Sequence, residues 1–211
     1  LLLWISNSLS PQEIRDRISG NDSVFEREMI NYLEAAHQGE FIERTLLEVE
    51  ADVKYAESDP RYKDPTQTLP ACPPIPCDHN NEDNCDECTC SSRWWEQYKN
   101  TVNDLLYRSN IHKCGDHCLV NGQCKARFPR PIIAKSSADT DDGSIQLKKL
   151  ESRLNTFMPV LTYVLRSNSD VTSLLSGTAL KAIVAYVTDY ITKTPLKTYT
   201  IFQTIRDVFD R

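Results

Sequence analysis

Apolar positions in the first part of the chain recur mainly at helical spacing. The short run Leu1 to Ser6 predicts a buried strand, because it is far too short to span a bilayer and has no basic flank. The next signal, Ser10-Pro11-Gln12-Glu13, combines an N-cap serine, a proline at N1 and a capping-box glutamate, so a helix should begin there. A second helix is predicted from about Ser23 to His37, and an acidic third segment follows from about Glu40 to Ala56.

In the middle of the chain, a proline-rich stretch separates two segments with helical periodicity. The stretch ESDPRYKDPTQTLPACPPIP predicts a linker or extended loop rather than a packed element. Arg93 to Ser109 then carries one broad apolar face and is predicted to be a helix that joins two groups of cysteines. That face comprises Trp94, Trp95, Tyr98, Val102, Leu105 and Leu106.

The last third predicts a turn, strands and a long helix. Asp139 to Gly143 is typical of a turn, and Phe157 to Val171 is rich in β-formers interrupted by Arg-Ser-Asn-Ser. A helix from about Ser176 to Thr192 should pack on the sheet through an apolar stripe. That stripe comprises Leu180, Ile183, Val184, Val187 and Ile191. We therefore predict an α+β fold, an antiparallel sheet with packed helices and an inserted Cys-rich zinc-binding segment, divided into 1–70, 71–130 and 131–211.

Charge is distributed unevenly along the chain. The formal net charge is −6, yet residues 1–92 hold 7 basic and 19 acidic side chains, whereas residues 93–211 hold 17 basic and 11 acidic ones. A polyanion such as nucleic acid is therefore expected to contact the second part. Solvated helix faces alone can also produce an excess of this size.

The 8 cysteines fall in two groups, and the first is ambiguous. Cys85-x-x-Cys88 has zinc-knuckle spacing, since two thiolates three residues apart can occupy adjacent corners of a tetrahedron. The surrounding candidates leave the partner pair open: Cys72, Cys77, His79 and Cys90. Interleaved histidines and a Cys-x-x-Cys favour metal ligands over disulfides.

The second group lies in NIHKCGDHCLVNGQCKARFPR. Its candidate ligands are His112, Cys114, His117, Cys118 and Cys124. The three cysteines supply three ligands, the last after an Asn121-Gly122 turn, and either histidine can be the fourth. A structural zinc ion would fold a loop with little apolar content and present nearby cations to nucleic acid from a rigid base. Those cations are Lys125, Arg127 and Arg130. The competing interpretation is a loop of reduced cysteines.

Tyr186, Tyr190 and Lys193 lie on the helix face that adjoins the apolar stripe, beside Ala179 and Ala182. Tyrosines next to a stripe are often half-buried packing residues. The small alanines leave room beside them, which favours a pair facing a cleft. A phenol is a poor nucleophile at neutral pH and needs a cation or a metal-polarised electrophile, and Lys193 can supply local positive charge.

Three stretches resemble one family across almost the whole chain. CKARFPR and NTFMPVLTYVLRSNSDVTSLLSGTALKAIVAYVTDYITK resemble the replication-initiator part of Helitron transposases, especially fungal ones. The opening LLLWISNSLSPQEIRDRI resembles the segment directly after that family's His-hydrophobe-His motif. The family belongs to the HUH endonucleases, which nick and join single-stranded DNA during rolling-circle transposition. The resemblance implies that Tyr186 and Tyr190 are the paired nucleophiles that form 5′-phosphotyrosine links and that Lys193 closes the motif.

The sequence departs from the family where its metal should bind. The His-hydrophobe-His pair is expected immediately before Leu1, and without it no magnesium or manganese ion is positioned on the scissile phosphate. The helicase domain expected downstream is also missing. We therefore expect a fragment of a nuclear transposase, inactive alone, that works with single-stranded DNA and the parent helicase domain and has no membrane association.

Two other interpretations remain open. The chain can be a zinc-stabilised module that binds single-stranded DNA or a protein without chemistry, with Trp94, Trp95 and Phe128 stacking on bases near Lys125 and Arg127. Core packing is the competing role for the two tryptophans. The chain can also be a degenerate transposon remnant. An in-frame His-x-His strand encoded upstream would separate a truncated gene product from a remnant.

Overall fold

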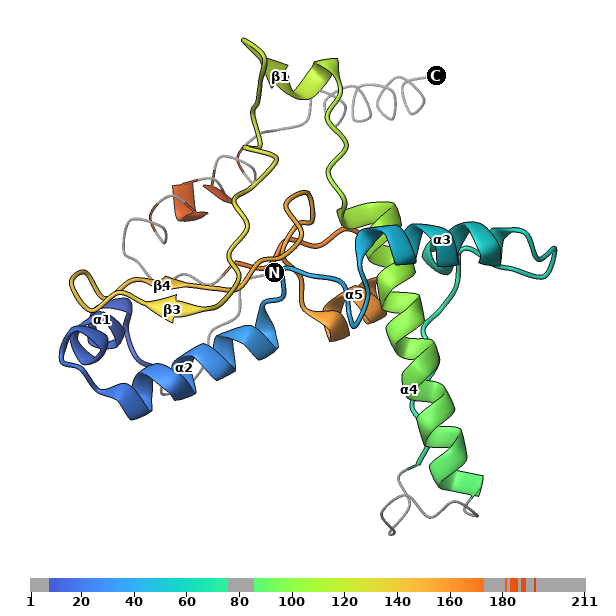
Figure 1. Cartoon of the computed structure of the whole chain (residues 1–211), viewed down its shortest axis with the longest axis horizontal. Coiled ribbons are helices and arrows are strands. Elements are labelled where there is room, and N and C mark those ends of the chain that lie inside the picture. The colour runs from blue at the N-terminus through green and yellow to red at the C-terminus, as the bar shows by residue number, and fades with distance from the viewer. Residues whose placement is uncertain are drawn as a thin grey trace, which may run out of the picture.

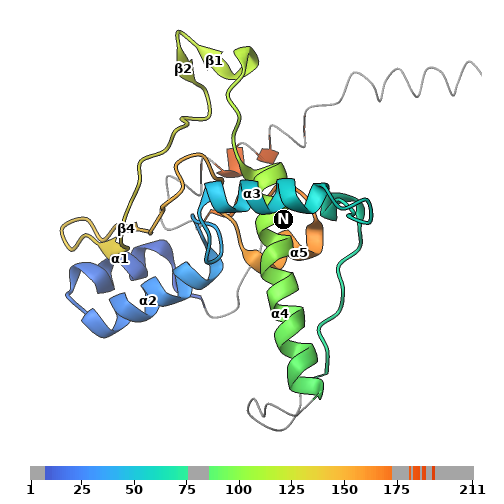
Figure 2. The ribbon, with the colours of Figure 1, turned by 45° about the vertical axis from the view of Figure 1, so that its right-hand side comes forward.

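The computed structural model describes residues 8–75 and 86–172, together with 181, 183–185, 187, 188 and 192. This part is mostly helical and carries two small antiparallel hairpins (Figure 1). Its helices are α1 (Pro11–Ser19), α2 (Ser23–Ala36), α3 (Leu46–Glu57), α4 (Asp86–Leu105) and α5 (Pro159–Leu165). Figures 1 and 2 show α3 and α5 beside the long helix α4, while α1 and α2 pack together on the other side. None of the described helices is long and apolar enough to cross a membrane.

The predicted start of α1 is confirmed. The Ser10 hydroxyl accepts a hydrogen bond from the Glu13 backbone N–H at 3.3 Å, and the Glu13 carboxylate accepts one from the Ser10 N–H at 2.7 Å. This reciprocal pair satisfies two donors that a helix start leaves unpaired. Buried Ile14 and Ile18 then pack with Phe25 of α2 in a small core of their own.

The hairpin of β3 (Ser137–Ala138) and β4 (Ile145–Gln146) covers this small core. The predicted turn at Asp139 to Gly143 joins its strands, and Gly143 has a φ of +67°. A Cβ added there would lie 2.8 Å from the Arg15 Cα of α1. Glycine is therefore required both by the left-handed backbone and by the close approach of α1.

The larger core lies where α3, α4 and α5 meet. Its buried members are Phe41, Val49, Val53, Tyr98, Val102, Leu106, Leu154, Phe157 and Tyr163. The predicted apolar face of α4 is confirmed except at Trp95, which is 52% exposed and meets the rings of Trp94 and Tyr98 edge to face. Trp94 is half-buried and packs against this core, so packing is its role, as the competing interpretation held. A π-helical turn at Leu106–Asn110 ends α4.

The strand predicted within Phe157 to Val171 is wrong, because residues Pro159–Leu165 form helix α5. Pro159 occupies the first turn, where its missing N–H costs nothing, and Arg166 ends the helix in a left-handed conformation. Tyr163 is buried against Tyr98 with ring centroids 4.8 Å apart. This contact with α4 overrides the β-propensity of the segment.

The proline-rich stretch is a loop with a single 3-10 turn at Pro65–Gln67, as predicted, but part of it packs against α4 instead of running free. The Tyr62 hydroxyl donates to the Asp104 carboxylate of α4, and Arg108 donates to the Tyr62 oxygen at 2.9 Å. Arg108 also pairs with Glu57 at 2.8 Å and lies 3.3 Å from Asp64. Burial, followed by the bond to Asp104, raises the pKa of Tyr62, because a phenolate there would lose water and face a carboxylate.

The described residues between 181 and 192 are helical, as predicted. Ile183 and Val187 are half-buried, but Val184 is 50% exposed and does not belong to a buried stripe. The strand predicted at Leu1 to Ser6 lies outside the described residues. Among the residues that the structure describes, strands form only the two short hairpins instead of the predicted larger sheet.

Candidate metal centre

A short hairpin with a two-residue turn positions the second cysteine group. Strands β1 (Leu119–Val120) and β2 (Gln123–Cys124) pair antiparallel, with Leu119 opposite Cys124. The predicted turn is confirmed: Asn121 and Gly122 have φ angles of 52° and 77°, as a tight hairpin requires. A further bond runs from the Lys125 N–H to the Cys118 carbonyl at 2.8 Å. The hairpin therefore brings the second and third cysteines together.

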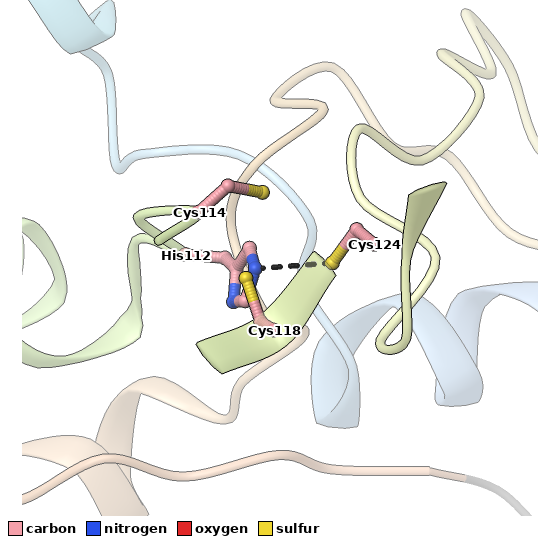
Figure 3. Close-up of side chains that lie close together, drawn as sticks. All are labelled: His112, Cys114, Cys118 and Cys124. Atoms are coloured by element: carbon pink, nitrogen blue, oxygen red, sulfur yellow. Dashed lines mark hydrogen bonds between the residues drawn. The ribbon is translucent and has the colours of Figure 1, made fainter. Parts of the chain in front are cut away.

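Four side chains converge at this hairpin (Figure 3). The ligand atoms of His112, Cys114, Cys118 and Cys124 all lie within 4.8 Å of one another, and the His112 Nε2 is 3.2 Å from the Cys124 Sγ. Tetrahedral zinc with one nitrogen and three sulfur ligands needs separations of roughly 3.5–4 Å. The cluster can therefore hold a metal ion such as zinc. Of the two histidines that the sequence offered as the fourth ligand, His112 belongs to the cluster. The side chain of His117 lies outside the described part.

Backbone groups prepare this cluster for thiolates. The Gly115 N–H donates to the Cys118 Sγ at 3.2 Å. Backbone N–H groups of Phe128 and then Ala126 lower the pKa of Cys124, because they stabilise its negative form.

The pKa of Cys114 is raised to about 11 by desolvation and by the adjacent sulfurs of Cys124 and Cys118. At Cys114, repulsion between neighbouring thiolates thus adds to the cost of desolvation. A bound cation would remove that repulsion and release protons, so metal affinity should rise with pH.

The imidazole of His112 is held by contacts outside the cluster. Its backbone N–H donates to the Arg153 carbonyl at 2.8 Å, next to an isolated bridge between Ile111 and Leu154. Its ring stacks on Phe128 with centroids 4.3 Å apart and planes at 13°. Phe128 is 7% exposed, so its predicted role as a base-stacking platform is wrong. It instead orients the histidine ligand.

The three predicted cations next to the hairpin differ in their surroundings. Lys125 and Arg127 are exposed. Arg130 is half-buried, with its guanidinium 4.5 Å from the Phe128 ring centroid and 3.8 Å from the Asp170 carboxylate. Arg130 therefore supports Phe128, while the other two are accessible to a polyanion.

The first cysteine group does not form a second cluster in the described part. Cys85, Cys77 and His79 lie outside the described residues. Cys88 is buried in the first turns of α4, while Cys72 and Cys90 are exposed. Across residues 8–75 and 86–172, only the group at His112 places three or more suitable ligands together.

The predicted catalytic residues Tyr186, Tyr190 and Lys193 lie outside the described residues. Their described neighbours 183–185, 187, 188 and 192 are helical. The relative geometry of the two phenols is therefore a prediction of the sequence alone.

Lys149 is a buried charged residue that the sequence analysis missed. Its side chain is 7% exposed, and its ammonium donates to the Leu154 carbonyl at 2.6 Å. Burial, assisted by the positive charge of Arg130, lowers its pKa to about 8. The sequence offered no usable signal, because alternation in an extended segment places Lys148 and Lys149 on opposite sides without saying which side is buried.

Comparisons with protein-family models, curated proteins and solved structures find no match to this chain.

Proposed function

We propose that the chain is part of a Helitron-type rolling-circle transposase in which a zinc-stabilised segment holds single-stranded DNA. The observation that carries this proposal is the convergence of His112, Cys114, Cys118 and Cys124, the last of which is the first residue of the CKARFPR stretch. Three thiolates and one imidazole complete a tetrahedron and leave no position for water, so the ion is structural rather than catalytic. The second predicted zinc pair, Cys85 and Cys88, remains a hypothesis.

The DNA contact follows from the rigidity and charge of this segment. With zinc bound, Lys125 and Arg127 project from a loop closed by four ligands, so little conformational entropy is lost when they meet phosphates. They belong to the basic part of the chain, residues 93–211. Phosphate neutralisation by such residues predicts binding that weakens as salt rises.

Nicking is proposed from the resemblance to the family. The Tyr186 or Tyr190 oxygen attacks the scissile phosphorus, a tyrosine–phosphorus bond forms, and the bond to the 3′ oxygen breaks. The phenol loses its proton to a base, and the leaving 3′ oxygen gains one. Magnesium or manganese would be held by the family's His-hydrophobe-His pair, which the resemblance places before Leu1. In the nucleus, the parent helicase domain would supply the single strand.

Fluorescence anisotropy with a labelled oligothymidylate tests the binding role. The zinc-loaded chain should bind, and Lys125→Gln with Arg127→Gln should weaken binding and reduce the salt slope by about 1.4, or 0.7 for each lost phosphate contact. Lys54→Gln with Arg61→Gln removes the same charge from the acidic part and is the matched control. Equal behaviour of the two double variants would overturn the proposed DNA surface.

A non-catalytic zinc module is the second candidate, because the Cys3His cluster is complete without the tyrosines. The test uses a longer protein that includes the upstream histidine pair. It should form a metal-dependent covalent adduct with single-stranded DNA, reduced by Tyr186→Phe or Tyr190→Phe and abolished by both. An adduct that persists in the double variant would favour the binding module.

A further inference from the structure

A cleft of about 430 Å³ lies between α3, the proline-rich stretch and α4, on the side of the larger core. Its charged lining residues are Arg44, Asp52, Lys63, Asp104 and Arg166. Its neutral lining includes potential hydrogen-bond donors at Thr68, Asn100 and Thr101. The cleft therefore combines cations and small polar groups, as sites for compact anions do.

The two carboxylates of the cleft already have partners. Asp52 lies 3.7 Å from the Arg44 guanidinium. Asp104 accepts from the Tyr62 hydroxyl and pairs with Arg108. Neither acid lies within ion-pair distance of Lys63 or Arg166, and within the described ranges no other carboxylate does. Lys63 and Arg166 therefore line the cleft without a direct ion-pair partner among the described residues.

Arg166 is aimed into this cleft by the end of α5. It adopts the left-handed conformation, with a φ of 54°, and its backbone N–H closes the helix on the Thr162 carbonyl at 3.0 Å. Its guanidinium lies over the Tyr163 ring at 4.5 Å from the centroid. One Nη reaches the Pro65 carbonyl at 3.5 Å, which is a weak bond at best.

The Nε of Arg166 is buried and has no hydrogen-bond partner among the described residues. Native proteins rarely leave a buried charged donor unpaired, since the lost hydration is not recovered. The Nε itself is closed to solvent, so a ligand in the cleft would accept from the Nη groups of the same guanidinium, one of which makes only the long bond to the Pro65 carbonyl. Phosphate matches the planar fork of arginine and can accept from several donors at once.

We propose that this cleft binds a phosphate group through Arg166, with Lys63 as the second cation. The site is separate from the His112 cluster, so it does not depend on the proposed zinc segment. The phosphate can come from a free nucleotide or from the backbone of single-stranded DNA. Both present the same oxygens to the arginine, and the experiment separates them.

Isothermal titration calorimetry of the zinc-loaded chain, at constant ionic strength, tests this site with inorganic phosphate, thymidine monophosphate and oligothymidylate. Saturable binding of at least one ligand is expected, and Arg166→Gln should weaken it by at least about tenfold. Arg166→Lys, which keeps the charge but not the fork, should lose an intermediate amount. Arg61→Gln removes a neighbouring exposed cation outside the cleft. Because salt screens exposed charges that do not touch the ligand, this variant should change the affinity by less than about twofold.

The ligand pattern identifies the source. Binding of phosphate or the mononucleotide indicates a free ligand site, whereas binding of oligothymidylate alone with the same Arg166 dependence indicates the DNA backbone. Circular dichroism checks that the variants fold. If Arg166→Gln does not fold, Lys63→Gln replaces it, because the Lys63 side chain is exposed. Absence of binding to all three ligands, or equal loss in Arg61→Gln, would overturn the proposal.

Discussion

Lys149 should make the stability of this protein increase with pH above neutrality. Its pKa is lowered by burial from 10.5 to about 8. Below pH 8 both folded and unfolded chains carry the proton, so the folded state bears the full cost of a buried ammonium. Between pH 8 and 10.5 the unfolded chain binds more protons, and the free energy of unfolding therefore rises with pH. A shift of this size corresponds to about 3 kcal/mol.

The substitution Lys149→Met isolates this effect. It removes the charge but keeps the apolar stem, and it leaves the Leu154 carbonyl without its donor, a cost of about 1–3 kcal/mol. At pH 7 the two changes should nearly cancel. At pH 10.5 the wild-type lysine is neutral and still hydrogen-bonded, so the variant should be the less stable protein. Between pH 7 and pH 10.5, the unfolding free energy of the wild type should therefore increase by about 3 kcal/mol relative to that of the variant.

Urea unfolding followed by circular dichroism at pH 7, 8, 9 and 10.5 measures this difference on zinc-loaded protein. Taking the difference removes the contribution of thiols and tyrosines that titrate in the same range. Lys148→Met is the matched control, because its side chain is 38% exposed and pairs with Glu40. A wild type minus Lys149→Met difference that stays constant across the series would refute the reasoning.

Three further outcomes are expected. Elemental analysis should find about one zinc per chain, lost in Cys124→Ser and in His112→Asn but retained in His117→Asn; retention in all three variants would exclude the assigned ligands. Tyr62→Phe should lower the unfolding free energy by about 1–3 kcal/mol, because it leaves a buried carboxylate on α4 short of a donor; no loss on urea unfolding would contradict this. Gly143→Ala should lower the thermal midpoint by several degrees or more, and an unchanged midpoint would show that the α1 contact yields.

Local chemistry made several features predictable from the sequence. Ser10 and Glu13 complete a capping box within one helical turn, and the Asn121-Gly122 dipeptide tolerates the positive φ angles of a tight hairpin. The cysteines of the second group are close in sequence, so a short hairpin is enough to gather them. The apolar face of α4 was likewise predictable, because its apolar residues recur at the spacing of a helix.

Only the tertiary structure decided features that depend on distant partners. Phe157 to Val171 has strand propensity, but Tyr163 gains more by packing on α4, and the segment becomes helical. The choice of His112 follows from its stack on Phe128 and its tether to Arg153, neither of which spacing reveals. The burial of Lys149 depends on contacts with chain segments that sequence periodicity does not relate. Propensity acts over a few residues, whereas packing energy is decided by whichever surfaces the fold brings together.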